Sequence, residues 1–148
     1  MMNIAIGCDH GGFLLKEELI PYLRALGHTV KDFGCYEKSS IDYPDYAFPV
    51  AEAVASGAYD RGIVICTTGI GVCICANKVR GIRCALCATL LQAELTRKHN
   101  NTNMLALGAE VTDATLSKQI VQTWLSTGFE GGRHARRVDK ITGYENTH

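Results

Sequence analysis

Five short strand-like segments alternate with helix-like segments along the chain, and this alternation limits the possible fold more than any other feature. Each segment is far shorter than the ~20 residues of a membrane-spanning helix, and its residue pattern predicts a strand. The predicted strands are Asn3–Cys8, Thr29–Phe33, Gly62–Cys66, Arg83–Cys87 and Met104–Leu107. The predicted helices are Gly12–Leu26, Pro44–Ser56, Ile70–Val79, Thr89–Lys98 and Asp113–Ser126, with a C-terminal helix over about 132–146.

Alternating strands and helices predict parallel strands joined by right-handed crossovers, with helices on both faces of the sheet. We therefore expect an α/β fold, a Rossmann-like three-layer α/β/α sandwich whose five-stranded parallel sheet has the order 2-1-3-4-5. Ligands bind such sheets beyond the carboxyl ends of the strands where the strand order reverses, here between the first and third strands. The 148 residues fit a single domain, 1–148.

Charge and composition exclude several classes of partner. Fifteen basic and fifteen acidic side chains cancel, so no global field favours nucleic acid or an anionic membrane. The N-terminal residues lack the basic and apolar regions of a signal peptide, and the apolar segments are too short to span a membrane. We expect a cytoplasmic protein without a nucleic-acid or membrane partner.

The seven cysteines lie mostly in strand-like or helix-like apolar segments, which favours small buried core residues over disulfides. Cys84 and Cys87 have the two-residue spacing of some zinc ligands, and Cys73 and Cys75 form a second close pair. However, their neighbours are apolar and no paired knuckle turn is present, so we expect no metal site.

Cys66 ends the third predicted strand, and the turn that follows it should begin a helix. The turn consists of Thr67, Thr68, Gly69, Ile70 and Gly71. The backbone N–H groups and positive end of a helix would favour a thiolate at Cys66 and would bind developing negative charge. The loop could therefore supply both a base and an oxyanion site. We expect an exposed Cys66 side chain, so that Cys66→Ala would leave folding intact.

Asp9 and His10 follow the first strand and precede two glycines, which places a carboxylate and an imidazole at the predicted ligand edge. The alternative is a helix-capping aspartate beside an exposed histidine. The dinucleotide fingerprint fails, because Ile74 holds its third glycine position, and no Gly-Lys-Ser/Thr phosphate loop occurs.

Two further groups of residues suit a phosphorylated substrate. Arg133 and Arg137 are four residues apart, so a helix would place both guanidinium groups on one face, although a solvated helix is the simpler interpretation. His99 and Asn100 follow a predicted helix, where the histidine could be an acid/base group or only a helix-end cation. With Cys66, these groups indicate aldose–ketose isomerisation. Acyl transfer by a Cys66 nucleophile with His99 as its base would leave the arginines unexplained.

The ordered combination of these motifs resembles the type B ribose-5-phosphate isomerase family, which includes allose- and galactose-6-phosphate isomerases. The resemblance covers essentially the whole chain. The segments that carry it are Gly7 to Gly12, Asp42 to Asp45, Cys66 to Gly71, Ala76-Asn77-Lys78, His99-Asn100 and Gly131 to His134.

The resemblance implies that Cys66 moves a proton between C2 and C1 of the sugar through an enediolate. Thr68 and the backbone of Thr67 to Gly71 would hold the oxygens of this intermediate. His99 would open the furanose ring with the help of Asp9. Another branch of the family has a glutamate base at the position of Val72, which cannot serve as one.

The resemblance further implies that His10, Arg133 and Arg137 bind phosphate and that Asn100 contacts the substrate. It implies a site built between two subunits of a homodimer, possibly within a dimer of dimers, and no cofactor. Three departures from the family pattern occur: Thr67 replaces a usual glycine, Glu110 replaces a frequent arginine, and Cys73 and Cys75 stand where small residues are usual. Allose or galactose 6-phosphate isomerisation and a non-catalytic sugar-phosphate sensor are the alternatives.

Overall fold

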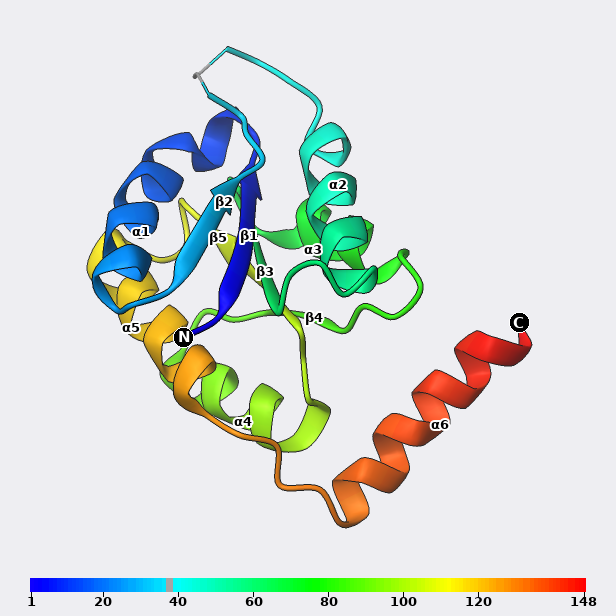
Figure 1. Ribbon diagram of the computed structural model, residues 1–148. Helices are drawn as coiled ribbons and strands as arrows, with labels where there is room; N and C mark the ends of the chain where they lie inside the picture. The colour runs from blue at the N-terminus through cyan, green and yellow to red at the C-terminus, as the bar shows by residue number, and fades with distance from the viewer. Residues whose placement is uncertain (37–38) are drawn as a thin grey trace.

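The computed structural model describes residues 1–36 and 39–148 and contains the expected α/β architecture, a parallel sheet between two layers of helices (Figure 1). The strands are β1 (Asn3–Cys8), β2 (Thr29–Asp32), β3 (Arg61–Cys66), β4 (Cys84–Leu86) and β5 (Met104–Gly108). The α-helices are α1 (Phe13–Ala25), α2 (Pro44–Ala55), α3 (Ile70–Asn77), α4 (Leu90–Asn100), α5 (Ala114–Ser126) and α6 (Arg133–Thr147), and the 3-10 turn His10–Gly12 precedes α1.

The strand order is β2-β1-β3-β5-β4, so the predicted order 2-1-3-4-5 is wrong in its last two positions. All five residues of β5 are buried, whereas β4 has only three residues and two of them are half-buried. A strand that is apolar on both faces suits the sheet interior, and a short strand suits its edge. The reversal between β1 and β3 remains where it was predicted.

The exchange of β4 and β5 decides which face α4 covers. The chain moves outward from β3 to β4 and then inward from β4 to β5, so a right-handed crossover places α4 on the opposite face from α3. Accordingly, α4 packs beside α5, and α2 packs beside α3. Asp113 caps α5 as predicted, because its carboxylate accepts a hydrogen bond of 2.8 Å from the Leu116 N–H.

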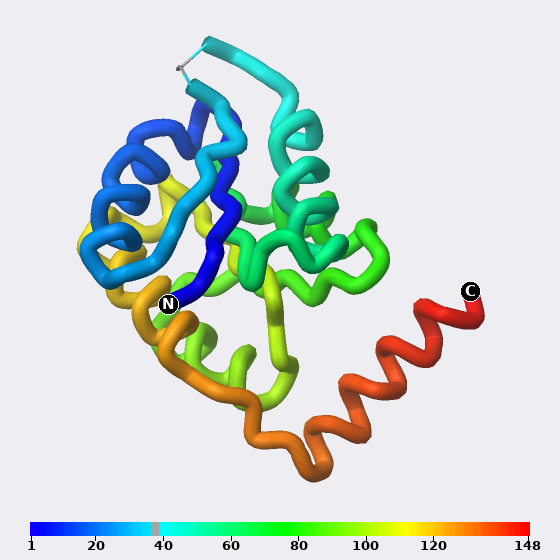
Figure 2. Tube along the Cα trace, viewed as in Figure 1, coloured from blue at the N-terminus to red at the C-terminus, as the bar shows by residue number. Residues whose placement is uncertain are grey.

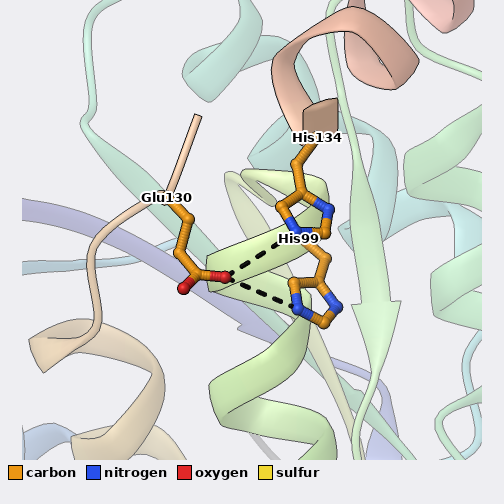
Figure 3. Close-up of side chains that lie close together, drawn as sticks. All are labelled: His99, Glu130 and His134. Atoms are coloured by element: carbon orange, nitrogen blue, oxygen red, sulfur yellow. Dashed lines mark ion pairs between the residues drawn. The ribbon is translucent and has the colours of Figure 1, made fainter. Parts of the chain in front are cut away.

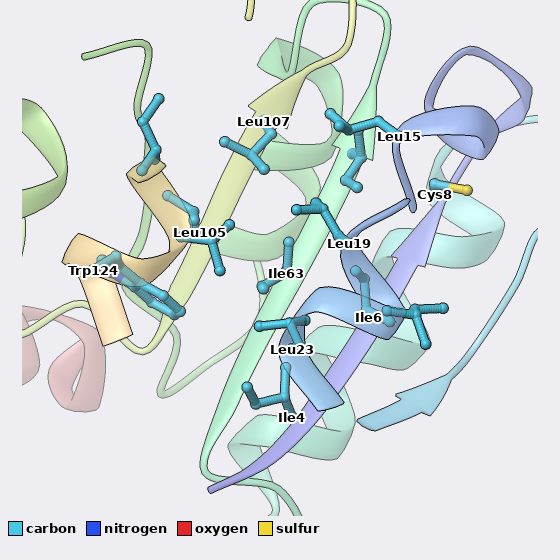
Figure 4. Close-up of a cluster of buried hydrophobic side chains, with 14 of the residues drawn as sticks. Ile4, Ile6, Cys8, Leu15, Leu19, Leu23, Ile63, Leu105, Leu107 and Trp124 are labelled. Atoms are coloured by element: carbon cyan, nitrogen blue, oxygen red, sulfur yellow. The ribbon is translucent and has the colours of Figure 1, made fainter. Parts of the chain in front are cut away.

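Each face of the sheet has its own apolar core. The larger core lies beneath α1, α4 and α5, where Leu19, Leu105 and Trp124 are fully buried (Figure 4). The smaller core lies beneath α2 and α3 and includes Val50 and Val64. Because both faces are covered, the sheet is rigid and the loops at its edges are left to form sites.

Helix α6 extends beside the rest of the molecule instead of covering the sheet (Figure 2). Its first turns contact α4, and Glu145 near its end accepts a hydrogen bond of 3.0 Å from the Gly81 N–H. Its apolar residues Ile141 and Tyr144 are exposed. Within the described residues, no helix combines the length and apolar character needed to cross a membrane.

Candidate active site

A hollow of about 440 Å³ opens at the carboxyl ends of β1 and β3, where the strand order reverses. The position agrees with the ligand edge expected from the sequence. The residues that line it are Asp9, Tyr43, Cys66, Thr67, Thr68, Ile70, Gly71 and Ile74. The structure therefore brings together the Cys66 loop and Asp9, as predicted.

Cys66 is held at the floor of this hollow. The Gly69 N–H donates a hydrogen bond of 3.1 Å to the Cys66 sulfur. Gly69 has a φ of 81°, and a Cβ atom there would lie 2.8 Å from the Leu107 carbonyl carbon, so only glycine fits this turn. The expectation of an exposed Cys66 is wrong: the residue is 6% exposed and packs in the smaller core.

Asp9 caps the 3-10 turn, as its alternative interpretation predicted. One carboxylate oxygen accepts hydrogen bonds of 2.9 Å from the Gly11 N–H and 3.2 Å from the Gly12 N–H. Asp9 also lines the hollow, so capping fixes the carboxylate without removing it from the site. His10 is half-buried, and its Nδ1 atom accepts a hydrogen bond of 3.2 Å from the Ile41 N–H.

Thr67, Thr68 and Ile70 are exposed on the Cys66 loop. Thr67 has no positive φ, so threonine needs no unusual backbone here, and its hydroxyl lies where a side chain on Gly11 would be. Thr68 Oγ1 accepts a hydrogen bond of 3.3 Å from the Ile70 N–H. The loop is therefore fixed by its own hydrogen bonds.

Glu110, the second departure from the family pattern, lies next to this loop. Its N–H donates a hydrogen bond of 3.0 Å to the Thr67 carbonyl, and the residue is exposed. Its carboxylate can therefore be solvated, which weakens its repulsion of an anion in the hollow.

The remaining predicted site residues form a second group at the other edge of the sheet. His99 and Asn100 are in the last turn of α4 and line a separate hollow of about 360 Å³, which shares no lining residue with the first. Arg83, directly before β4, donates a hydrogen bond of 3.0 Å from Nε to the Asn100 carbonyl. This contact places the end of α4 at the amino ends of the strands.

Arg133 and Arg137 are exposed in the first turns of α6, and α6 contacts α4. The two groups of predicted residues are separated by roughly the length of β3, about 17 Å for six residues. Within one chain, Cys66 and His99 therefore do not converge.

Three neighbouring residues were not predicted as site residues. Tyr43 lines the first hollow, and a side chain on Gly71 would collide with its ring. Glu130 and His134 lie beside His99, with Glu130 Oε1 3.6 Å from His99 Nε2 and 3.7 Å from His134 Nε2 (Figure 3). Glu130 lies before α6, so its spacing of four residues from His134 is not a helical pattern and no local signal identified the pair.

The neighbours of several groups shift their pKa values. Partial burial, His99 and the nearby arginines lower the pKa of His134, and Glu130 opposes this shift. Burial and the nearby Cys66 raise the pKa of Cys75. Cys73 is half-buried, and a hydrogen bond from Cys84 lowers its pKa to about 7.

Comparison with known proteins identifies the family. The Ribose/Galactose Isomerase family matches residues 4–141. Ribose-5-phosphate isomerase B of Escherichia coli (strain K12) is 49% identical over 145 residues, which cover 98% of this chain and 97% of that protein.

Two solved structures agree along nearly the full length. Clostridium thermocellum ribose-5-phosphate isomerase B has a TM-score of 0.97 and 52% identity, with 99% of both chains covered. The Mycoplasma genitalium ribose-5-phosphate isomerase B structure, with bound ribulose-5-phosphate, has a TM-score of 0.94 and 43% identity, with 97% of this chain and 96% of that chain covered. The chain belongs to the ribose/galactose isomerase family.

Proposed function

We propose that this protein interconverts ribose 5-phosphate and ribulose 5-phosphate through an enediolate, without a cofactor and with Cys66 as the base. The observation that carries the proposal is the hydrogen bond of 3.1 Å from the Gly69 N–H to the Cys66 sulfur, at the floor of a solvent-facing hollow. A thiolate held in this way can remove the proton from C2 of the open-chain aldose and return it at C1. The ligand of the Mycoplasma genitalium relative supports the choice of substrate.

The other groups have separate roles in this proposal. Thr68 and the backbone N–H groups from Thr67 to Gly71 hold the enediolate oxygens, where negative charge develops. His99 opens the furanose ring by proton transfer, assisted by Asp9.

We assign phosphate binding to the imidazole of His10 and the guanidinium groups of Arg133 and Arg137. Asn100 contacts the sugar. The two arginines are exposed and one helical turn apart on α6, so both guanidinium forks are available to one phosphate group. Helix α6 thereby serves as the phosphate-binding element of the domain.

We also propose that the working protein is a homodimer in which each site combines the Cys66 hollow of one copy with the His99 group of the other. Separation of these groups to opposite edges of the sheet supports this arrangement. The exposed apolar residues on the projecting α6 are suited to contact a second copy. Two such dimers could associate further into a dimer of dimers.

Mixing two inactive variants tests the shared site. A heterodimer of Cys66→Ala and His99→Ala contains one site with both mutations and one site with neither. Random pairing should therefore restore about a quarter of the activity of the unmodified protein. If each site lies within one chain, mixing restores nothing.

Proton NMR in D₂O with ribose 5-phosphate tests the reaction itself. We expect ketose formation with deuterium entering the exchanged carbon, and loss of both in Cys66→Ala. Faster turnover of allose 6-phosphate or galactose 6-phosphate would assign the substrate to those branches. Binding of all three sugars without turnover would indicate a sensor and would overturn the proposal.

We place the protein in the cytoplasm. None of the seven cysteines, all of which lie in the described part of the chain, forms a disulfide. Cys8 Sγ and Cys35 Sγ are 3.8 Å apart, so two thiols remain separate even where they are in contact. This pattern suits a reducing compartment.

A further inference from the structure

Two imidazoles and a carboxylate converge from three segments at the amino edge of the sheet. His99 comes from the last turn of α4, Glu130 from the segment between α5 and α6, and His134 from the first turn of α6 (Figure 3). One ligand atom from each residue lies within 4.8 Å of the other two. The imidazole rings stack, with centroids 4.1 Å apart and planes 12° apart.

The backbone holds this His–Glu–His cluster together. The Glu130 N–H donates a hydrogen bond of 3.1 Å to the Lys98 carbonyl, which joins the segment before α6 to the end of α4. Gly131 and Gly132 then reverse the chain with φ values of 72° and 57°, a conformation that favours glycine. The His134 side chain is 11% exposed, whereas those of His99 and Glu130 are 38% and 52% exposed. The cluster is therefore positioned by the fold and open to solvent.

The donor set and its spacing suit a transition metal. Two histidines and one carboxylate form a familiar three-ligand zinc site that leaves a fourth position for water. With bonds of about 2.1 Å, the ligand atoms of a tetrahedral site lie about 3.4 Å apart. The distances from Glu130 Oε1 to the two Nε2 atoms, 3.6 Å and 3.7 Å, are already close to this value. The stacked rings must turn so that their lone pairs converge, which the more exposed His99 can do.

We propose that His99, Glu130 and His134 form a binding site for Zn²⁺ and similar divalent transition metals, and that an ion bound there inhibits isomerisation. The inhibitory part rests on the proposed function, because the metal would occupy the imidazole that opens the sugar ring. Nitrogen ligands disfavour Mg²⁺ and Ca²⁺, so these ions should not inhibit.

Neighbouring charges set a limit on the affinity. Arg133 and Arg137 lie close enough to His134 to act on its protonation, and both repel a dication. Both are exposed, so water and salt screen this repulsion. Lys98 is already paired with Glu94 at 2.7 Å. We therefore expect binding that strengthens as ionic strength rises.

The test is titration calorimetry of the full chain with Zn²⁺ alone, beside inhibition assays with ribose 5-phosphate. Glu130→Gln and His134→Ala each remove one ligand, whereas Glu94→Gln and His148→Ala change a carboxylate and a histidine outside the cluster. Loss of an outer-shell partner alone costs about 10- to 100-fold in metal affinity. We expect at least this loss in the two cluster variants, a matching rise in the inhibitory Zn²⁺ concentration, and no change in the controls.

Different outcomes separate this inference from the proposed function. Unchanged Zn²⁺ affinity in both cluster variants would overturn the inference and point to thiolate binding, for which Cys66→Ala is the check. Zn²⁺ binding that is lost in the cluster variants but does not inhibit would overturn the inhibitory part. If no sugar phosphate is turned over, calorimetry still tests the metal site, and only the proposed function fails. Circular dichroism of each variant excludes misfolding as the cause of lost binding.

Discussion

Replacement of Lys16 by methionine should destabilise the fold without touching the candidate site. Lys16 is a helix α1 residue whose side chain is fully buried, and its Nζ atom lies 2.7 Å and 2.8 Å from the two Asp32 carboxylate oxygens. The same ammonium donates a hydrogen bond of 2.5 Å to the Cys35 carbonyl. Methionine keeps most of the aliphatic volume and removes the charge with these three hydrogen bonds, together with the weaker 3.8 Å ion pair to Glu17 and the cation–π contacts with the Phe13 and Tyr36 rings.

The expected loss of folding free energy depends on the solvent exposure and the hydrogen bond that the Asp32 carboxylate keeps in the variant. Removal of one partner from a buried ion pair costs about 3–5 kcal/mol, because the other charge stays buried. The Asp32 side chain is 24% exposed and still accepts a hydrogen bond of 2.8 Å from the Gly34 N–H. Water can therefore reach part of the remaining carboxylate, and the loss should lie at the lower end, about 3 kcal/mol.

Urea unfolding followed by circular dichroism measures this loss. With a slope of about 2.5 kcal/mol per molar urea, the unfolding midpoint should fall by about 1.2 M. Protein concentration must be the same in all samples, since association stabilises the folded state. Lys118→Met is the control, because its ion pair with Glu18 is 3.5 Å long and its side chain is 35% exposed. Such surface pairs contribute less than about 1 kcal/mol. Equal midpoint shifts in both variants would refute the reasoning.

Three further predictions concern the site and its surroundings. Arg137→Ala should raise KM for ribose 5-phosphate about 10- to 100-fold with little change in kcat, since a charge-assisted contact to phosphate persists through the reaction. Arg136→Ala, which removes the neighbouring exposed guanidinium, is the control. A change in kcat alone would contradict the assignment. Gly69→Ala should lower the free energy of unfolding, measured in urea, by about 1–3 kcal/mol and should reduce kcat, because the φ of 81° is strained for alanine and the new Cβ meets Leu107. Gly128→Ala, which has open space around it, should change neither quantity. The Cys73 thiol, whose pKa a hydrogen bond from Cys84 lowers to about 7, should react with iodoacetamide about tenfold faster at pH 8 than at pH 6. Peptide mass spectrometry would check this rate against Cys87, whose pKa burial raises to about 12, and equal rates would contradict the prediction.

Local patterns in the sequence were sufficient to predict the elements of the fold. The prediction for β1 agrees with the structure at both ends, and α2 begins at Pro44 as expected. These features depend on residues next to one another, such as a proline that fits the first turn of a helix. The turn after Cys66 was predicted for the same reason.

Strand order depends on contacts that local patterns do not contain. Both the predicted and the observed orders join β3, β4 and β5 by allowed right-handed crossovers. Burial distinguishes them, because β5 is buried throughout and β4 is not. The uninterrupted apolar run from Met104 to Leu107, beside a segment that begins with Arg83, was a usable signal for this difference.

The position of His99 follows from topology alone, whichever face α4 covers. A crossover helix begins near the carboxyl end of one strand and returns the chain to the amino end of the next, so its last turn lies at the amino edge. His99 is in that last turn, whereas Cys66 ends a strand at the carboxyl edge. A mechanism that needs both residues therefore requires a second copy of the chain, whatever the details of packing. What topology could not supply is the partner of His99: Glu130 reaches it only because its N–H bonds to the Lys98 carbonyl, a contact between segments about thirty residues apart.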